Sequence, residues 1–183
     1  MSTNTEVTIE DLYRVPENGK AEIVNGEIVC MSPTGDKPSR ASLQICLRLY
    51  EYEQSAGAGI AVADNAGFIV DLPKRRSFSP DAAFYTGLRT GMKFFEGAPV
   101  FAVEVRSEGD YGARAEAQMS AKRADYFAAG TLVVWDVDLL SETVVKVYRT
   151  DEPEKPTIYH RGERAEAEPA VPGWSMKVDD LFQ

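Results

Sequence analysis

The chain has 183 residues, which suits a single hydrophobic core, and we expect residues 1–183 to form one domain. Its composition, 44% hydrophobic and 27% charged, is typical of a soluble globular protein, and no apolar run approaches the roughly 20 residues that a membrane helix needs. The net charge of −9 by itself opposes binding to the polyanion DNA, and the one histidine excludes a histidine metal cluster within one chain.

The N-terminal part predicts a short helix followed by a β-hairpin. Thr8 begins the motif Thr8-Ile-Glu-Asp-Leu-Tyr, with Asp11 at the position that completes a capping box. Two runs rich in β-branched residues, 20–24 and 27–31, flank the pair Asn25-Gly26. Asn-Gly between such runs favours a type I′ turn, because both central residues of that turn need a positive φ.

The next segment predicts a loop at 32–38 and an amphipathic helix at 39–55. We expect this helix to have a wide apolar face made of Leu43, Ile45, Cys46, Leu47, Leu49, Tyr50 and Tyr52. Short apolar runs at 60–63, 67–72 and 82–85 then predict strands.

Residues 100–136 predict a strand, a helix at 112–129 and a second strand, which is the pattern of a right-handed crossover. Both strand candidates are nearly continuous apolar runs, as is typical of strands covered on both faces. A stripe of small residues along the helix is expected to pack closely: Ala113, Ala117, Ala121, Ala124 and Ala128. With later strands at 143–148 and 157–159 and a short helix near Val178, the class is α/β or α+β, with a mixed sheet flanked by helices.

Three charged residues are candidates for chemistry. Glu104 lies in a buried run, where a carboxylate is costly unless it is paired or bound to metal; the alternative is a strand-end residue that reaches solvent or pairs with an arginine. Asp81 follows Pro80 and lies either at the mouth of a strand or in a turn. Lys122 shares an otherwise apolar helix stripe with Tyr126, where it either meets a carboxylate or extends to solvent.

Other polar residues complete this set. Gln118 lies one turn before Lys122 on the same helix and is a candidate to share its site. Glu22 by itself reads as an ordinary exposed strand residue, and Asp136 is an alternative buried acid. Because histidine is scarce, any metal should be a hard cation that carboxylates hold.

The charge is unevenly distributed along the chain. Residues 74–123 contain nine basic and six acidic residues, so this segment is +3 and the remainder is −12. The segment indicates either a surface that faces phosphates or a chance cluster of solvated charges. Cys30 and Cys46 suit a reducing compartment, and residues 1–6 lack the pattern of a signal peptide, so we expect a cytoplasmic location.

Six motifs in this order resemble one known family. They are Glu22-x3-Gly26-Glu27, Met31-Ser-Pro, Pro80-Asp81, Val103-Glu-Val-Arg-Ser107, Lys122-x3-Tyr126-x3-Gly130 and Trp135-Asp-Val. Together they resemble the putative restriction endonuclease family, also called domain of unknown function 820, of the PD-(D/E)XK superfamily. The resemblance implies a restriction-endonuclease-like core with a four-stranded mixed sheet.

The resemblance also implies site residues. Its acids carry over to Glu22, Asp81 and Glu104, and the family lysine that comes from the following helix is Lys122. The superfamily lysine two residues past the glutamate is replaced by Arg106. Further departures occur at Pro38-Ser39, Glu108, Gln118 and the segment 131–135.

These implications predict a Mg²⁺- or Mn²⁺-dependent DNA endonuclease. Asp81, Glu104 and the carbonyl of Val105 are expected to bind the ion, and Glu22 to act as an outer ligand or to orient water. Lys122, with Arg106, is expected to offset charge on the phosphate. A homodimer would supply the two sites that double-strand cleavage needs. The alternatives are a catalytically impaired nuclease-fold protein that acts as a binding module, and a hydrolase of another phosphoryl substrate.

Overall fold

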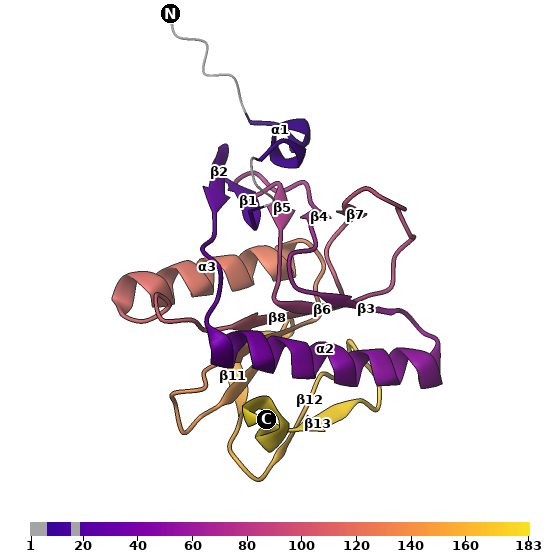
Figure 1. The fold of residues 1–183 in the computed structure, drawn as a ribbon, viewed down its shortest axis with the longest axis vertical. Coiled ribbons are helices and arrows are strands. Elements are labelled where there is room, and N and C mark those ends of the chain that lie inside the picture. The colour runs from indigo at the N-terminus through magenta and orange to yellow at the C-terminus, as the bar shows by residue number, and fades with distance from the viewer. Residues whose placement is uncertain (1–6, 16–18) are drawn as a thin grey trace, which may run out of the picture.

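A six-stranded mixed sheet is the centre of the fold in the computed structural model, which describes residues 7–15 and 19–183 (Figure 1). The strand order is β11-β10-β9-β8-β6-β3. The strands are β3 (Ile60–Ala63), β6 (Ala82–Tyr85), β8 (Phe101–Val105), β9 (Val133–Val137), β10 (Val145–Arg149) and β11 (Glu152–Tyr159). Only β8 and β9 in this sheet are parallel neighbours, and this confirms the expected mixed sheet.

Two long helices cover opposite faces of this sheet (Figure 1). Helix α2 (Asp36–Ala56) shares a core with Phe101 and Val103 of β8. Helix α3 (Ala113–Ala128) connects β8 to β9, and its Tyr126 shares a second core with Ala102. Because side chains alternate along a strand, Glu104 points to the same face as Ala102 and therefore toward α3. The predicted strand–helix–strand crossover is confirmed, and it brings this acid to the helix that carries the candidate lysine.

The N-terminal elements lie on the α3 side of the sheet (Figure 1). Helix α1 (Ile9–Tyr13) has the predicted capping box between Thr8 and Asp11. Strands β1 (Ala21–Val24) and β2 (Glu27–Cys30) form the predicted hairpin, with φ of 52° at Asn25 and 76° at Gly26. Residues 1–6, which bear on the prediction of no signal peptide, are outside the described residues.

A small sheet and a C-terminal layer complete the fold. Strands β5 (Ser77–Phe78), β4 (Phe68–Ile69) and β7 (Phe95–Glu96) form a three-stranded sheet beside β1. The predicted strand at 67–72 is therefore only two residues long, and β5 and β7 were not predicted because two-residue strands leave no periodicity to detect. Strands β12 (Arg164–Glu166) and β13 (Ser175–Lys177) and the 3-10 helix η2 (Val178–Phe182) share the core of α2.

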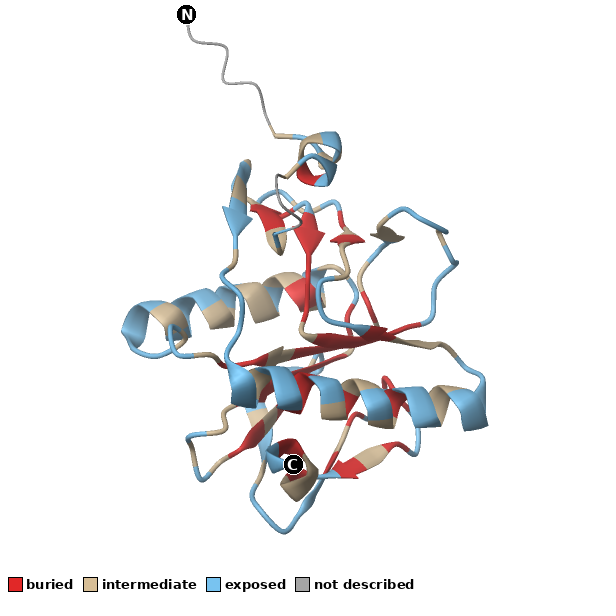
Figure 2. Cartoon of the chain, in the orientation of Figure 1, coloured by how far each residue is buried: buried red, intermediate tan, exposed pale blue. Residues whose placement is uncertain are grey.

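Two predictions about helix faces are wrong. Helix α2 begins at Asp36 instead of residue 39, because Pro38 lies in the first turn, where no backbone N–H is needed. Its buried face is narrow, because the sheet covers only one side of the helix (Figure 2). Ala41, Ser42, Ile45 and Leu49 are buried, whereas Leu43, Leu47 and Tyr50 are exposed.

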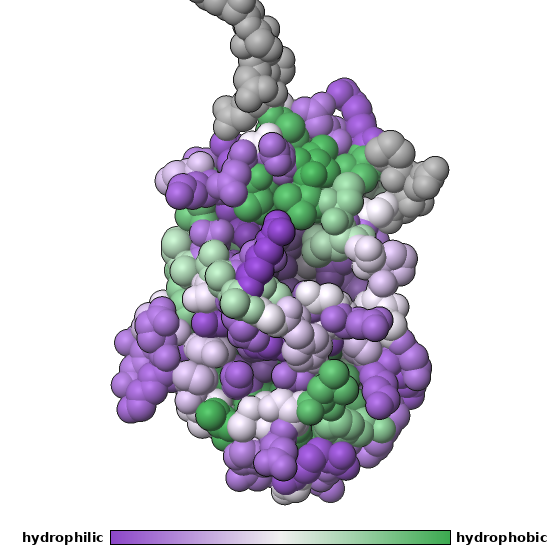
Figure 3. Space-filling view, turned by 90° about the vertical axis from the view of Figure 1, so that its left-hand side faces the viewer, coloured by the Kyte–Doolittle hydropathy of each residue, from purple (hydrophilic) through white to green (hydrophobic). Residues whose placement is uncertain are grey.

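The alanine stripe of α3 is exposed throughout and does not pack closely. The opposite stripe, which contains Lys122 and Tyr126, faces the sheet instead, and two opposite stripes cannot both contact one sheet. This stripe holds α3 through both the polar contacts of Lys122 and the apolar packing of the Tyr126 ring on Phe78. On the face shown in Figure 3, hydrophobic groups gather at the height of α1 and β2 and again toward the opposite end, and the region between them is largely hydrophilic.

Candidate nuclease site

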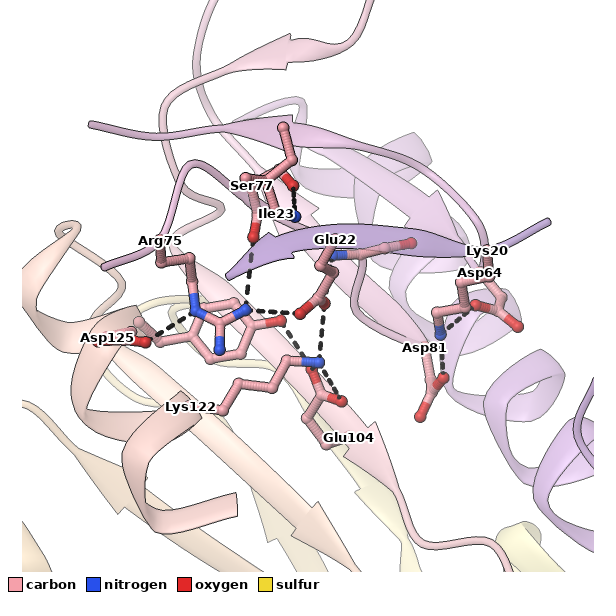
Figure 4. Close-up of polar contacts among 12 residues, drawn as sticks. Lys20, Glu22, Ile23, Asp64, Arg75, Ser77, Asp81, Glu104, Lys122 and Asp125 are labelled. Atoms are coloured by element: carbon pink, nitrogen blue, oxygen red, sulfur yellow. Dashed lines mark hydrogen bonds and ion pairs between the residues drawn. The ribbon is translucent and has the colours of Figure 1, made fainter. Parts of the chain in front are cut away.

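Lys122 lies between two glutamates that come from different sheets (Figure 4). Its Nζ is 2.8 Å from Oε1 of Glu104, on β8, and 2.9 Å from Oε1 of Glu22, on β1. The Tyr126 hydroxyl, one turn further along α3, donates to Oε1 of Glu104 over 2.7 Å. Lys122 therefore meets carboxylates and does not extend to solvent, which decides between the two possibilities left open by the sequence. Glu22 is buried, with 4% exposure, and is not the surface residue that its sequence context suggested.

Glu22 is fixed by two further groups. Nη1 of Arg75 lies 2.6 Å from Oε2 of Glu22, and the backbone N–H of Ser79 donates to Oε1 over 2.8 Å. The guanidinium of Arg75 is buried, and its Nε also donates to Asp125 over 2.8 Å. Arg75 therefore joins the hairpin to α3 and sets the position of the carboxylate that faces Lys122.

Asp81 lies at the entrance to β6, and a second lysine contacts it. Its Oδ2 accepts the backbone N–H of Val105 over 2.7 Å, which places the carboxylate next to the end of β8. Its Oδ1 is 2.5 Å from Nζ of Lys20, and this ammonium is also 2.7 Å from Oδ1 of Asp64 (Figure 4). Asp81 and Glu104 are thus brought to the same edge of the sheet.

Burial and neighbouring charges shift the pKa values of Glu104, Glu22 and Lys122. Burial raises the pKa of Glu104, and repulsion from Asp81 and Glu22 adds to this against the attraction of Lys122. Burial also raises the pKa of Glu22, but the attraction of Lys122 and Arg75 outweighs it and the net pKa is lowered. Burial lowers the pKa of Lys122, but attraction to Glu104 and Glu22 outweighs it, so the net pKa is raised and the ammonium stays charged at neutral pH.

The contacts leave this cluster with an excess of negative charge. Five carboxylates take part, those of Glu22, Asp64, Asp81, Glu104 and Asp125. Three cations face them, those of Lys20, Arg75 and Lys122. With all five carboxylates ionised, the formal charge of the cluster is −2.

Two of the predicted auxiliary residues lie apart from this cluster. Arg106 makes a two-pronged ion pair with Asp136, at 2.7 Å for each contact, and also bonds Glu116 on α3. Asp136, the alternative buried acid, is therefore held by a cation of its own. Gln118 is exposed. Val105 contributes the N–H that Asp81 accepts.

The arrangement suits a metal that keeps water ligands. In the part of the chain that the structure describes, no three His, Cys, Asp or Glu side chains are placed to hold a metal ion together. The carboxylates of Asp81 and Glu104 are hard oxygen donors, which Mg²⁺ and Mn²⁺ prefer. Mg²⁺ is commonly bound through one or two carboxylates and retains several waters, so this donor set fits such an ion.

Sequence reasoning missed Lys20, Asp64, Arg75 and Asp125. One signal was present for Lys20, because residues 20 and 22 flank Ala21 in the predicted hairpin strand and so point to the same face. Lys20 and Glu22 indeed both point toward the acids of the cluster (Figure 4). The other three residues lie in turns, at a helix end or in short strands, where no periodic pattern indicates direction.

A mixed sheet between two helices, with acids at the ends of its central strands, agrees with the restriction-endonuclease-like fold expected from the sequence. The family model described as Uma2, putative restriction endonuclease, matches residues 9–179, and the chain belongs to this family. A solved structure of similar fold is a putative nuclease of DUF820 from Anabaena variabilis, with a TM-score of 0.75, 16% sequence identity, and coverage of 96% of this chain and 97% of that one. No curated protein matches. No helix among the described residues has the length and hydropathy of a membrane span.

Proposed function

We propose that this protein is a metal-dependent endonuclease of the PD-(D/E)XK type that hydrolyses phosphodiester bonds in DNA. The observation that carries the proposal is the buried ammonium of Lys122 between Glu22 and Glu104, at the edge of the sheet where Asp81 also lies. Membership of a family described as putative restriction endonucleases supports it. Acids and a lysine at one sheet edge are the groups that phosphodiester hydrolysis needs.

Asp81 and Glu104, with the carbonyl of Val105, would hold Mg²⁺ or Mn²⁺, and Glu22 would be an outer ligand or orient water. The two uncompensated negative charges of the cluster support a dication there. When bound, such an ion lowers the pKa of a water ligand and stabilises charge on the reacting phosphate.

The protein's own groups hold this arrangement. The Val105 N–H fixes the carboxylate of Asp81, and the Tyr126 hydroxyl fixes that of Glu104. Glu22 positions Lys122, whose ammonium presents a positive charge beside the acids. That charge would stabilise the negative charge that gathers on the phosphate oxygens in the transition state.

The basic segment 74–123 supports a nucleic-acid substrate, although the whole chain is acidic. Two of the cations in this segment, Arg75 and Lys122, are used within the cluster. Arg106 is buried against Asp136, and the exposed basic residues of the segment would meet the phosphates around the cleavage site. Cleavage of both strands would require two sites, and a homodimer would supply them.

The test is cleavage of supercoiled plasmid DNA with Mg²⁺ or Mn²⁺. We expect nicking or linearisation by the wild type and loss of it in Asp81→Ala and Glu104→Ala. Asp71→Ala is the matched control, because that acid is highly exposed and its one ion pair among the described residues is with Arg76, at 3.5 Å. Activity that survives both Asp81→Ala and Glu104→Ala would contradict the mechanism, and so would a folded wild type that cleaves neither DNA nor RNA with either metal.

A second candidate function is that of a binding module on the same fold. The observation that favours it is that the acids of the cluster already have cationic partners within the chain. Thermal melting during a Mn²⁺ titration discriminates the two, because a ligand that binds the folded state raises its stability. A shift that Asp81→Ala abolishes supports the metal site, and no shift at millimolar Mn²⁺ supports the binding module.

A further inference from the structure

Lys20 contacts the carboxylate of Asp81, one of the two acids that the proposed function assigns to the metal. Its Nζ lies 2.5 Å from Oδ1 of Asp81, and the Val105 N–H occupies the other oxygen, Oδ2. Only 16% of the Lys20 side chain and 19% of the Asp81 side chain are exposed. Both oxygens of the carboxylate thus have a partner, and a cation that binds at Oδ1 would lie beside the ammonium of Lys20 and would be repelled by it.

The second partner of Lys20 offers a place for the ammonium to go. Oδ1 of Asp64 is 2.7 Å from Nζ and is more exposed, at 38%. The N–H of Asn65 donates to this same oxygen over 2.6 Å, and Asn65 has a φ of 65°, so a tight turn fixes the Asp64 carboxylate. Lys20 can therefore leave Asp81 and keep one ion pair.

Lys122 does not have this freedom. Its partner Glu22 is buried and held by Arg75 and the Ser79 N–H, so the ammonium stays between two fixed carboxylates. Of the two lysines in the cluster, Lys20 is the one whose alternative partner faces solvent.

We propose that Lys20 is an internal counter-ion that a divalent cation displaces from Asp81, and that Asp64 retains the displaced ammonium. The proposal rests on the metal site of the proposed function. It assigns to Lys20 and Asp64 control over how tightly the site binds metal. Lys20 weakens binding by competing for Asp81, and Asp64 strengthens it by giving the ammonium another partner.

The two residues therefore have opposite expected effects. Lys20→Met removes the competitor, and we expect the dissociation constant for Mn²⁺ to fall by about 10- to 100-fold, the same size as the affinity losses that follow removal of a supporting partner of a metal ligand, but in the opposite direction. Asp64→Asn leaves Lys20 with Asp81 as its only carboxylate, so the dissociation constant should rise. Lys20→Arg keeps the positive charge and should remain much closer to the wild type than Lys20→Met.

The measurement is the binding of Mn²⁺ alone to the full chain, followed by the electron paramagnetic resonance signal of free Mn²⁺. Lys155→Met is the matched control, because this lysine is 82% exposed and its nearest acid, Glu152, is 4.0 Å away. Melting curves in EDTA show whether each variant is folded. If Lys20→Met does not fold, Asp64→Asn still tests the proposal through its weaker binding.

The double variant Lys20→Met/Asp64→Asn separates retention of the ammonium from direct ligation. If Asp64 acts only through Lys20, Asp64→Asn should have little effect once Lys20 is gone. Wild type that binds Mn²⁺ while Lys20→Met binds it equally or more weakly overturns this inference and leaves the proposed function standing. If neither wild type nor Lys20→Met binds Mn²⁺, both the inference and the metal site are wrong.

Discussion

Replacing Lys122 with methionine tests the reasoning about the cluster most directly. Methionine keeps much of the length and apolar surface of the lysine stem but removes the ammonium. Glu22 and Glu104 then face one another with no cation between them, although Arg75 still contacts Glu22. We expect a large loss of stability in the absence of any metal.

The magnitude follows from the contacts. Unit charges 4 Å apart interact by about 4 kcal/mol at an effective dielectric constant of about 20, and Lys122 contacts two carboxylates at shorter distances. Removing one partner of a buried ion pair typically costs about 3–5 kcal/mol. Glu104 can take up a proton to relieve the repulsion, because burial already raises its pKa, so we expect a value near the lower end of that range.

The assay is urea unfolding with EDTA present, with the free energy of unfolding extrapolated to water. For a chain of this size a loss of about 3–5 kcal/mol lowers Tm by roughly 6–20 °C. Lys122→Met/Glu104→Gln removes both charges of one pair and should recover most of the loss. A single variant that loses less than about 1 kcal/mol, or a double variant less stable than the single one, would refute the argument.

Two further predictions concern neighbouring contacts. Arg106→Met should lower the free energy of unfolding, measured in urea, by about 3–5 kcal/mol, because the buried guanidinium pairs with Asp136 and Glu116. The same change should leave the affinity for Mn²⁺ unchanged, and a change in affinity would place Arg106 in the cluster. Arg106 lowers the pKa of Glu116 below 4.5, so this contact stabilises the fold above that pH, and the stability gap between wild type and variant should narrow as the pH falls through the Glu116 pKa. Tyr126→Phe keeps the ring stacked on Phe78 at 4.0 Å but removes the hydroxyl that Glu104 accepts, so unfolding should show a loss of about 1–3 kcal/mol, and no loss would mean that the contact is dispensable.

The part of the site on β8 and α3 could be predicted from the sequence. Strand β8 is a long apolar run interrupted by one acid, and helical spacing in α3 places Lys122 and Tyr126 on one stripe. A parallel crossover folds the helix back over its own strand, so these local patterns were enough to bring Glu104 and Lys122 together.

The part that depends on β1 and the loops could not be predicted in the same way. Glu22 looked like a surface residue because a hairpin strand does not show which face the rest of the chain will cover. Its burial comes from Arg75 and Ser79, more than 50 positions away. The prediction of a wide buried face on helix α2 was wrong for a related reason, since seven apolar residues around the helix do not show how many of them one sheet can cover.

The two lysines of the cluster differ in what their partners allow. Lys122 is enclosed by Glu22 and Glu104, so its charge is a fixed part of the fold. Lys20 has one largely buried partner, Asp81, and one more exposed partner, Asp64, and under our proposal its ammonium would move from the first to the second. Because Asp64 belongs to the cluster, an ammonium that moves from Asp81 to Asp64 remains within it, and binding of one dication would change the formal charge of the cluster from −2 to 0 while the sheet and Lys122 stay in place. The fold thus separates the positive charge that would stabilise the phosphate from the one that would yield to the metal.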